Sequence, residues 1–252
     1  PATATTSWTG GEMTGSGRFV VGSGGSFSMS GGGTKFMRKT IENRSANAEW
    51  TGGTWFFDNA NFENMAGATF TASGANLGPV GGSSNAINNA GTFNKAGSSD
   101  LFLNSGVAIN NSGTLNIQGG SLQVFGGGSN NGAINVSAGS TLFFGTNFTH
   151  GAGSTISGAG NVRFHFSNHS ISSGFTASGA VDLFLANVTI GSSFASSGVL
   201  VNNSTLNVNA NQTWGTLSLT NFPTLGGTGD VTVSGATSWS DGQVTGGGKL
   251  TA

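Results

Sequence analysis

Cysteine is absent from this chain of 252 residues, and charged side chains are scarce. The missing cysteine excludes disulfides, thiolate metal sites and a cysteine nucleophile. Charged residues make up 7% of the chain, against about a quarter in most soluble domains, and the formal net charge is -1. Such a chain has no long-range field that would attract polyanions. We interpret its densest basic stretch, from Lys35 to Lys39, as a solvated or paired cluster followed by Glu42. No nucleic-acid partner is expected.

Long apolar runs are lacking as well. No run reaches the roughly 18 residues that a membrane span needs, so we expect no membrane insertion. The first residues, PATATTSW, have neither the basic nor the apolar region of a signal peptide, so an export signal would lie outside the printed sequence. A cysteine-free composition rich in Thr, Asn and Gly is typical of proteins outside a bacterial cell. It predicts an extracellular or cell-surface location.

Glycine and large hydrophobic residues are abundant. The 46 Gly would suit a disordered linker, but 19 Phe and 5 Trp give the chain a core to bury. The dominant pattern is alternation of apolar and polar residues, which predicts short strands with one buried face. It is seen in SFSMS (26–30), TLNIQ (114–118), AINV (133–136), VRFHF (162–166), TLNV (205–208) and DVTV (230–233). Gly-rich turns separate these segments, and we expect almost no helix.

A longer period lies over the alternation. Asn-containing turns recur as IEN (41–43), FEN (62–64), INN (87–89), INN (109–111) and NN (130–131). The last Asn of each motif falls at positions 43, 64, 89, 111 and 131. HGAG (150–153) and SGFTASG (173–179) hold the same place further on, and VNN (201–203) repeats the motif. A period of about 22 residues indicates a solenoid. In such a fold, the asparagines of neighbouring repeats can stack as hydrogen-bonded ladders.

One repeat contains three short strands. They are VAINN (107–111), GTLNI (113–117) and GSLQVF (120–125). Three strands per turn, each paired in parallel with its equivalent in the next turn, form a β-helix. The predicted fold is therefore all-β: a single parallel β-helix (β-solenoid) over residues 1–252, with about eleven three-strand coils of roughly 22 residues. Such a rod would be on the order of 50 Å long.

Several segments resemble the β-helical repeat regions of large secreted bacterial surface proteins of the filamentous-haemagglutinin and autotransporter-adhesin type. The likeness is carried by INNAGTF (87–93), INNSGTLNIQGGSL (109–122), AINVSAGSTL (133–142) and ISGAGNV (156–162). It spans most of the chain. The resemblance implies a β-helical rod, stalk or adhesive surface.

The two ends of the sequence resemble each other. TSWTGGEMTGSGRFVV (6–21) and TSWSDGQVTGGGKLTA (237–252) align without a gap, with Trp8 opposite Trp239. Two coils of one solenoid can share a motif in this way. Alternatively, residues 6–236 are one copy of a higher-order tandem repeat and residues 237–252 begin the next. On the second interpretation, Trp8, Trp239, Lys249 and Leu250 lie near an end-to-end joint. The partner is then the protein itself, head to tail, because neither end shows a helical or charged cap.

The polar residues do not form a recognisable catalytic centre. The nine acidic residues are scattered, and only Glu42 and Glu63 share a repeat position, where we expect them on the surface with Arg44 or Lys39 nearby. His165 and His169 are interpreted as outward polar residues without a third metal ligand. Motifs for phosphate or dinucleotide binding and for a serine nucleophile are missing. We expect no enzyme activity, no metal site and no cofactor.

The expected function is structural: an extracellular rod or fibre that continues end to end as a filament, stalk or adhesin shaft. A polysaccharide-binding or polysaccharide-cleaving β-helix is the alternative, with surface polysaccharide as its partner. Its candidate contact residues are Trp50, Trp55 and Asp58. If these residues line an open groove, the alternative is favoured. If they are buried in the coil, the rod is favoured.

Overall fold

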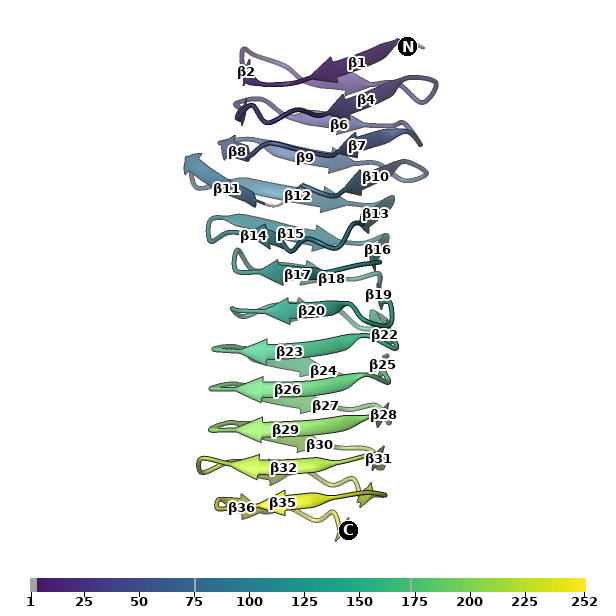
Figure 1. Ribbon diagram of the computed structural model, residues 1–252, viewed down its shortest axis with the longest axis vertical. Coiled ribbons are helices and arrows are strands. Elements are labelled where there is room, and N and C mark those ends of the chain that lie inside the picture. The colour runs from purple at the N-terminus through teal and green to yellow at the C-terminus, as the bar shows by residue number, and fades with distance from the viewer. Residues whose placement is uncertain (1–3, 75, 173) are drawn as a thin grey trace.

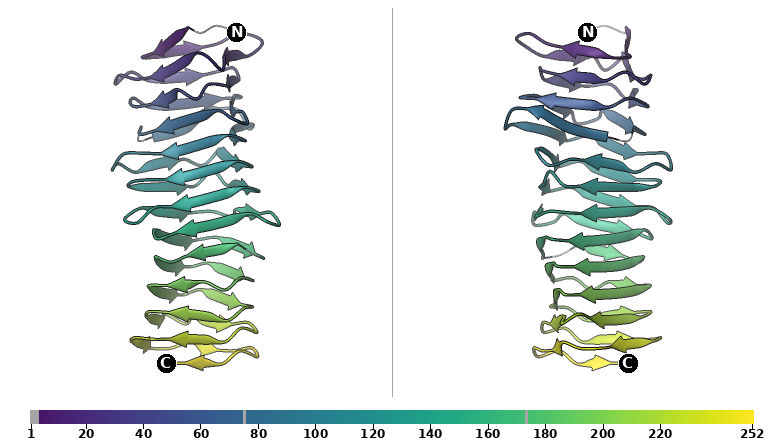
Figure 2. Two further views of the ribbon diagram at one scale, coloured as in Figure 1. Left: turned by 90° about the vertical axis from the view of Figure 1, so that its right-hand side faces the viewer. Right: turned by 60° about the vertical axis from the view of Figure 1, so that its left-hand side comes forward.

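The computed structural model describes residues 4–74, 76–172 and 174–252. Within these ranges every regular element is a strand, and the strands stack in parallel into a β-solenoid of about 12 turns, shown in Figures 1 and 2. The described part of the chain therefore contains no helix that could cross a membrane. The predicted all-β parallel solenoid is confirmed.

Three faces run along the rod, and each turn contributes one strand to each face. Face A is a nine-stranded sheet followed by a four-stranded one. Its strands are β1 (Thr5–Trp8), β4 (Ser26–Met29), β7 (Ala48–Trp50), β10 (Thr69–Ala72), β13 (Thr92–Lys95), β16 (Thr114–Ile117), β19 (Ala133–Val136), β22 (Thr155–Gly158), β25 (Phe175–Ala177), β28 (Ala195–Ser196), β31 (Gln212–Trp214), β34 (Val231–Val233) and β37 (Leu250–Thr251).

Face B is a single twelve-stranded sheet. Its strands are β2 (Gly11–Met13), β5 (Lys35–Met37), β8 (Trp55–Asp58), β11 (Asn76–Gly81), β14 (Leu101–Leu103), β17 (Ser121–Val124), β20 (Thr141–Phe144), β23 (Asn161–His165), β26 (Ala180–Phe184), β29 (Gly198–Asn202), β32 (Leu217–Thr220) and β35 (Thr237–Trp239).

Face C is a seven-stranded sheet followed by a five-stranded one. Its strands are β3 (Phe19–Val21), β6 (Ile41–Asn43), β9 (Asn61–Asn64), β12 (Asn85–Asn89), β15 (Val107–Asn111), β18 (Gly128–Asn130), β21 (Thr149–His150), β24 (Asn168–Ile171), β27 (Asn187–Ile190), β30 (Thr205–Val208), β33 (Thr224–Gly226) and β36 (Gln243–Val244). The three strands predicted within residues 107–125 correspond to β15, β16 and β17.

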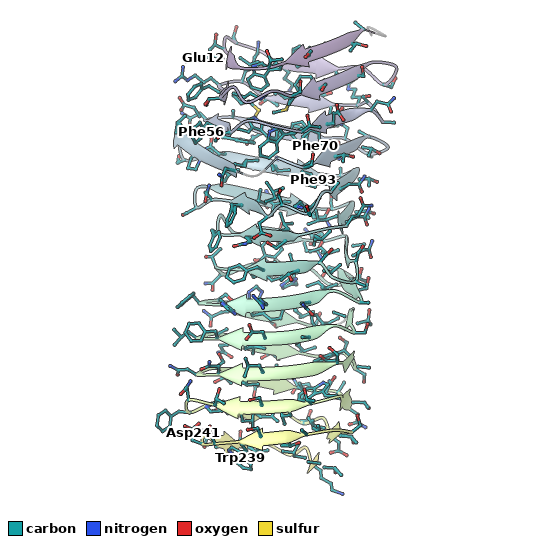
Figure 3. The ribbon with its side chains drawn as sticks, viewed as in Figure 1. Glu12, Phe56, Phe70, Phe93, Trp239 and Asp241 are labelled. Carbon is teal, nitrogen blue, oxygen red and sulfur yellow. The ribbon has the colours of Figure 1, made fainter. Side chains whose placement is uncertain are left out.

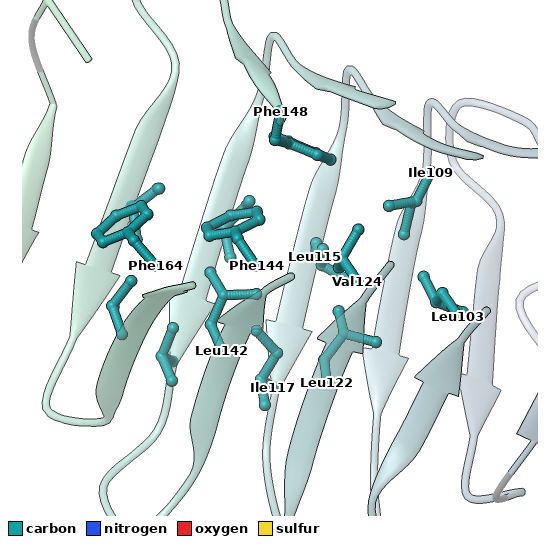
Figure 4. Close-up of a cluster of buried hydrophobic side chains, with 14 of the residues drawn as sticks. Leu103, Ile109, Leu115, Ile117, Leu122, Val124, Leu142, Phe144, Phe148 and Phe164 are labelled. Atoms are coloured by element: carbon teal, nitrogen blue, oxygen red, sulfur yellow. The ribbon is translucent and has the colours of Figure 1, made fainter. Parts of the chain in front are cut away.

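The core lies inside the coils and follows from the alternation. In β16, Leu115 and Ile117 point inward, and the residues beside them point outward. Parallel pairing in register places Leu115 on Ile134 of the next coil, so inward side chains stack in columns (Figure 4). Each such side chain, when fully buried, contributes about 1.5–3 kcal/mol of hydrophobic free energy.

The length of a coil varies along the rod. The coil that joins Asn64 to Asn89 takes 25 residues and lies in the aromatic part of the core, where Trp55 packs on Phe62 and Phe70. Near the C-terminus, coils of 18 residues enclose mainly Val and Leu. These shorter coils explain why the chain completes about 12 turns.

A column of buried amides runs along face C. Asn43 donates a hydrogen bond from Nδ2 to Oδ1 of Asn64, and the same bond links Asn64 to Asn89, Asn89 to Asn111 and Asn111 to Asn130, at 2.7–2.8 Å. The predicted asparagine ladder is therefore confirmed. Its fifth member is Asn130, not the predicted Asn131, because Asn111 pairs in register with Asn130.

Beyond the ladder, histidines occupy the same column. His150 pairs with Asn130 in the strand register, which confirms that the HGAG segment holds the equivalent place. Nε2 of His150 lies 3.0 Å from Nδ1 of His169 in the following coil. The next member is Val188, from which the column continues as aliphatic residues. The later VNN motif is not part of this series, because Asn202 lies at the end of β29 on face B. The segment 173–179 is not part of it either: residue 173 lies outside the described residues, and Phe175–Ala177 form β25 on face A.

Two lysines are buried near the turns that lead from face A to face B. Nζ of Lys35 donates to the carbonyl oxygens of Gly33 and Gly52, at 3.1 and 2.9 Å. Nζ of Lys95 donates to three carbonyls, the shortest bond being 2.7 Å to Gly119. Burial lowers the pKa of both ammonium groups. Lys35 is thus not a solvated surface charge, as its basic segment suggested, but a buried donor that satisfies backbone oxygens.

Candidate functional site

The clearest candidate site is the last coil, β35 to β37, whose inward side is uncovered. Trp239 pairs in register with Leu219, which is fully buried, yet Trp239 itself is 51% exposed (Figure 3). Val244 and Leu250 follow on the next two strands and are only partly buried against the core. Each of these strands ends the order of its sheet. One row of backbone N–H and C=O groups is therefore free to pair with a further strand.

The first coil, β1 to β3, forms the opposite end of the rod. Its inward residues are Trp8, Met13 and Phe19. Trp8 is covered by Met29 of the second coil and is 7% exposed. The strands of this coil also stand first or last in their sheets.

The two similar segments form corresponding strands on different faces. Trp8 lies in β1, Met13 in β2 and Phe19 in β3, and their aligned partners lie in β35, β36 and β37. Strand β1 belongs to face A, whereas β35 belongs to face B. The chain from Trp8 to Trp239 therefore makes eleven turns and one further strand, so the second segment is rotated by one face relative to the first.

The other two predicted joint residues point in different directions. Leu250 pairs in register with the buried Val231 and packs partly against the core, so its side chain faces the open end. Lys249 is exposed. Its backbone N–H donates to Oδ1 of Asp230 at 2.8 Å, which fixes the turn that leads into β37.

The predicted carbohydrate contacts do not form a surface. Trp50 and Trp55 are both 0% exposed, and their rings pack edge to face inside the coil, 5.5 Å apart. Asp58 is on the outside, where it accepts a hydrogen bond from Arg38 at 3.1 Å. The prediction that these three residues could bind a sugar together is therefore corrected. Alternation places both indoles on the inward side of their strands.

Four of the nine acidic residues form ion pairs: Glu12, Glu42, Asp58 and Asp182. Glu42 and Glu63 are neighbours in register, as predicted, but Glu42 is buried and not on the surface. Its carboxylate accepts hydrogen bonds from Arg18 at 2.6 Å and from Arg44 at 2.5 Å. These bonds lower the pKa of Glu42, and the bond from Arg18 has the largest effect. In the described residues, no three histidine or acidic side chains lie close enough together to hold a metal ion.

The two predicted outward histidines behave differently. His165 is partly exposed and lies 3.1 Å from Oδ2 of Asp182. His169 is 5% exposed, so its prediction as an outward residue is corrected. It belongs to the buried histidine pair and contacts the rings of Phe144 and Phe164. Burial lowers the pKa of His150 to about 4 and that of His169 to about 3.

One feature of the surface was missed from the sequence. At the turns from face B to face C, Phe166, Leu185 and Phe222 are exposed and have positive φ angles. A repeat signals this corner: FSNHSI (166–171), LANVTI (185–190) and NSTLNV (203–208) share a corner residue, a small residue, a polar residue and then a strand. Its step is shorter than the period of the asparagine turns, so a search at that period does not align it.

No protein-family model, curated protein or solved structure matches this chain.

Proposed function

We propose that this protein is an extracellular structural rod that continues end to end, as a filament, a stalk or an adhesin shaft. The observation that carries the proposal is the uncovered last coil, where Trp239 exposes half of its surface at a position that is fully buried one coil earlier. A further coil placed on β35 to β37 would bury this indole and pair the free backbone groups. It can belong to the same chain in a tandem array or to a second copy stacked head to tail.

The side walls of the rod also suit a structural role. Few charges are present, and many of the described ones are paired, as in the contacts of Arg38 with Glu12 and Asp58. Rods of this kind would repel each other weakly, because the net charge is only -1. Side-by-side bundling and adhesion are therefore compatible with end-to-end growth. We assign no catalytic step and no cofactor to this rod.

The cysteine-free composition and the resemblance to secreted bacterial repeat regions support a location outside a bacterial cell. A filament in that setting needs strength without disulfides. Parallel backbone pairing along the axis supplies it, since pulling the rod apart breaks one strand pairing on every face at once.

The test is a charge placed at the open end. We expect the wild-type protein at rising concentration to form filaments in negative-stain electron microscopy and to sediment faster. Trp239→Lys should weaken this association by at least about tenfold, because the joint would have to bury an unpaired ammonium group. Val80→Lys is the matched control, since Val80 is 46% exposed on face B, away from the ends, and the control should associate like the wild type.

Two results would contradict head-to-tail stacking. One is a wild-type particle that stays single and short at every concentration. The other is filaments that form equally well with Lys at position 239.

A further inference from the structure

A ridge of apolar side chains stands on the corner between faces B and C. Phe166 is 62% exposed, Leu185 is 43% exposed and Phe222 is 81% exposed. Their φ angles are 52°, 50° and 58°, in the left-handed region that bulky side chains disfavour. Asn59 and Asn203 occupy the corresponding position in two other coils, with φ angles of 47° and 46°. Asn221, which precedes Phe222 in the same turn, also has a positive φ angle, 59°.

The fold itself does not require these hydrophobic residues. Asparagine and glycine adopt a left-handed conformation at much lower cost, and the corner accepts asparagine in two of its coils. Phe222 buries little of its surface, and Phe166 and Leu185 each leave a large part of theirs exposed, so burial offsets the strain only in part. Strained residues that also expose apolar surface are typical of functional sites.

A groove of about 550 Å³ lies along the ridge. Ser167, Ala186 and Ser204 form its buried floor. The far wall is polar and consists of Asn168, Asn187 and Thr205, which are neighbours in strand register. The groove runs parallel to the rod axis across four coils, a length of ~14 Å at the usual strand spacing.

The side chains that line the groove determine which class of ligand it can bind. Its ten lining residues include no charged side chain, so it offers nothing to a phosphate or carboxylate group. Apolar faces on one wall suit the C–H faces of sugar rings, and amide groups on the other suit hydroxyl groups, which both donate and accept hydrogen bonds. The polar wall repeats in three successive coils, whereas the apolar wall has Asn203 in place of an apolar residue in the third of its four coils. An extended pyranose unit is about as long as the spacing between coils.

We infer that this groove binds a linear, neutral polysaccharide lying along the rod axis. The sugar rings would stack on Phe166, Leu185 and Phe222, and Asn168 and Asn187 would bond their hydroxyl groups. The site lies on the side of the rod, so the inference does not depend on end-to-end continuation.

The test is isothermal titration of the full chain with cellohexaose, xylohexaose, maltohexaose and chitohexaose. We expect at least one of them to bind, and oligogalacturonate, which is charged, to bind more weakly. The variant F166N/L185N/F222N should lose at least about tenfold in affinity. Its melting temperature should stay equal or rise, because asparagine fits the left-handed corner. This combination distinguishes lost contacts from a lost fold. Asn187→Ala should weaken binding on the opposite wall, and Val80→Asn, an exposed substitution elsewhere, should leave it unchanged.

Three results would overturn the inference. The first is that none of the four neutral hexasaccharides binds. The second is that the triple variant keeps the wild-type affinity. The third is that the triple variant abolishes self-association while sugar binding is absent in the wild type, which would make the ridge a contact between copies of this chain.

Discussion

At the scale of single residues, polar side chains at inward positions determine how the core responds to its surroundings. His150 and His169 follow five asparagines in one column and share a single hydrogen bond of 3.0 Å. Nδ1 of His150 and Nε2 of His169 are buried without a partner among the described residues. Neutral imidazoles tolerate this environment better than cations do, because an unpaired buried charge is far more costly than an unpaired dipole.

This pair should make the solenoid sensitive to acid. The folded pKa values, about 4 for His150 and about 3 for His169, lie below the ordinary value of 6.5. The unfolded chain therefore binds more protons as the pH falls below about 6.5. The stabilising effect of the neutral pair is complete above that pH and is lost between there and the folded pKa values. We expect a loss on the order of 3 kcal/mol per histidine between about pH 7 and about pH 4.

Urea unfolding across this pH range measures the effect. The double variant with His150→Asn and His169→Asn extends the asparagine column and removes both imidazoles. Carboxylates such as Glu42 titrate in both proteins, so the difference between the two pH profiles isolates the histidines. Identical profiles would contradict the prediction.

Alternation predicts which side of a strand a residue takes, but residue type can mislead. Leu115 and Ile117 are predicted to point inward both by their place in the alternation and by their apolar side chains. His169 has the same parity as the inward Ile171, and Lys95 has the same parity as the inward Phe93. The signal was therefore present in the sequence. It is obscured because polar residues are usually placed outside, and only the carbonyl oxygens at the turn, brought close by folding, show why Lys95 can be buried.

At the scale of the elements, asparagine ladders hold one coil to the next. Asn89 accepts a bond from Asn64 and donates to Oδ1 of Asn111 and to the carbonyl oxygen of Thr114, at 2.7 and 2.9 Å. Its neighbour in the chain, Asn88, faces outward and bonds Glu63 at 2.9 Å. Inner and outer amides thus make similar bonds in different surroundings.

These neighbours provide a matched pair of variants. Asn89→Ala should lower the free energy of unfolding by ~3 kcal/mol, because it leaves buried groups on three residues unsatisfied. Asn88→Ala should cost less than ~1 kcal/mol, since water can replace the bond that Asn88 donates to Glu63 and the one that it accepts from Asn110. Chemical denaturation of both variants measures the difference. Equal costs would mean that the buried ladder adds nothing beyond an exposed hydrogen bond.

The strand order and the ladder could be predicted from the sequence because both depend on local spacing. Coil length could not. The period was read from the N-terminal half, where coils enclose bulky aromatic residues such as Trp55 and Phe70. It shortens to 18 residues in the C-terminal half, although the coils there also enclose Phe194 and Trp214, so the size of the core residues alone does not set it. The site at the corner beside Phe166 was missed because its repeat follows the shorter period.

At the scale of the whole molecule, the offset between the two similar segments would relate one copy of a tandem repeat to the next. If residues 237–252 begin a second copy, each copy contains eleven turns and one strand. It then advances along the axis by ~54 Å, and the next copy is turned by one face. Neither value could be read from the sequence, because the spacing of the two segments does not reveal how many strands lie between them.

A two-copy chain tests this geometry. We expect residues 22–252, attached directly after Ala252, to extend the rod without a break and to cover Trp239 as Met29 covers Trp8. Electron cryomicroscopy should show the second copy displaced by ~54 Å and turned by a third of a revolution. Acrylamide should quench fewer tryptophans per copy than in the single chain. A bend between two separate rods, or a second copy without rotation, would rule out the tandem repeat.

The rotation by one face also affects how such an assembly would meet a surface. In three successive copies, the corner beside Phe166 would face three different directions. A polymer chain that contacts the fibre from any side would therefore have one such corner available in every third copy. Several weak attachments along one long polymer then act together, and their combined strength exceeds that of each alone. A fibre built in this way could bind such a polymer in any rotational orientation about its own axis.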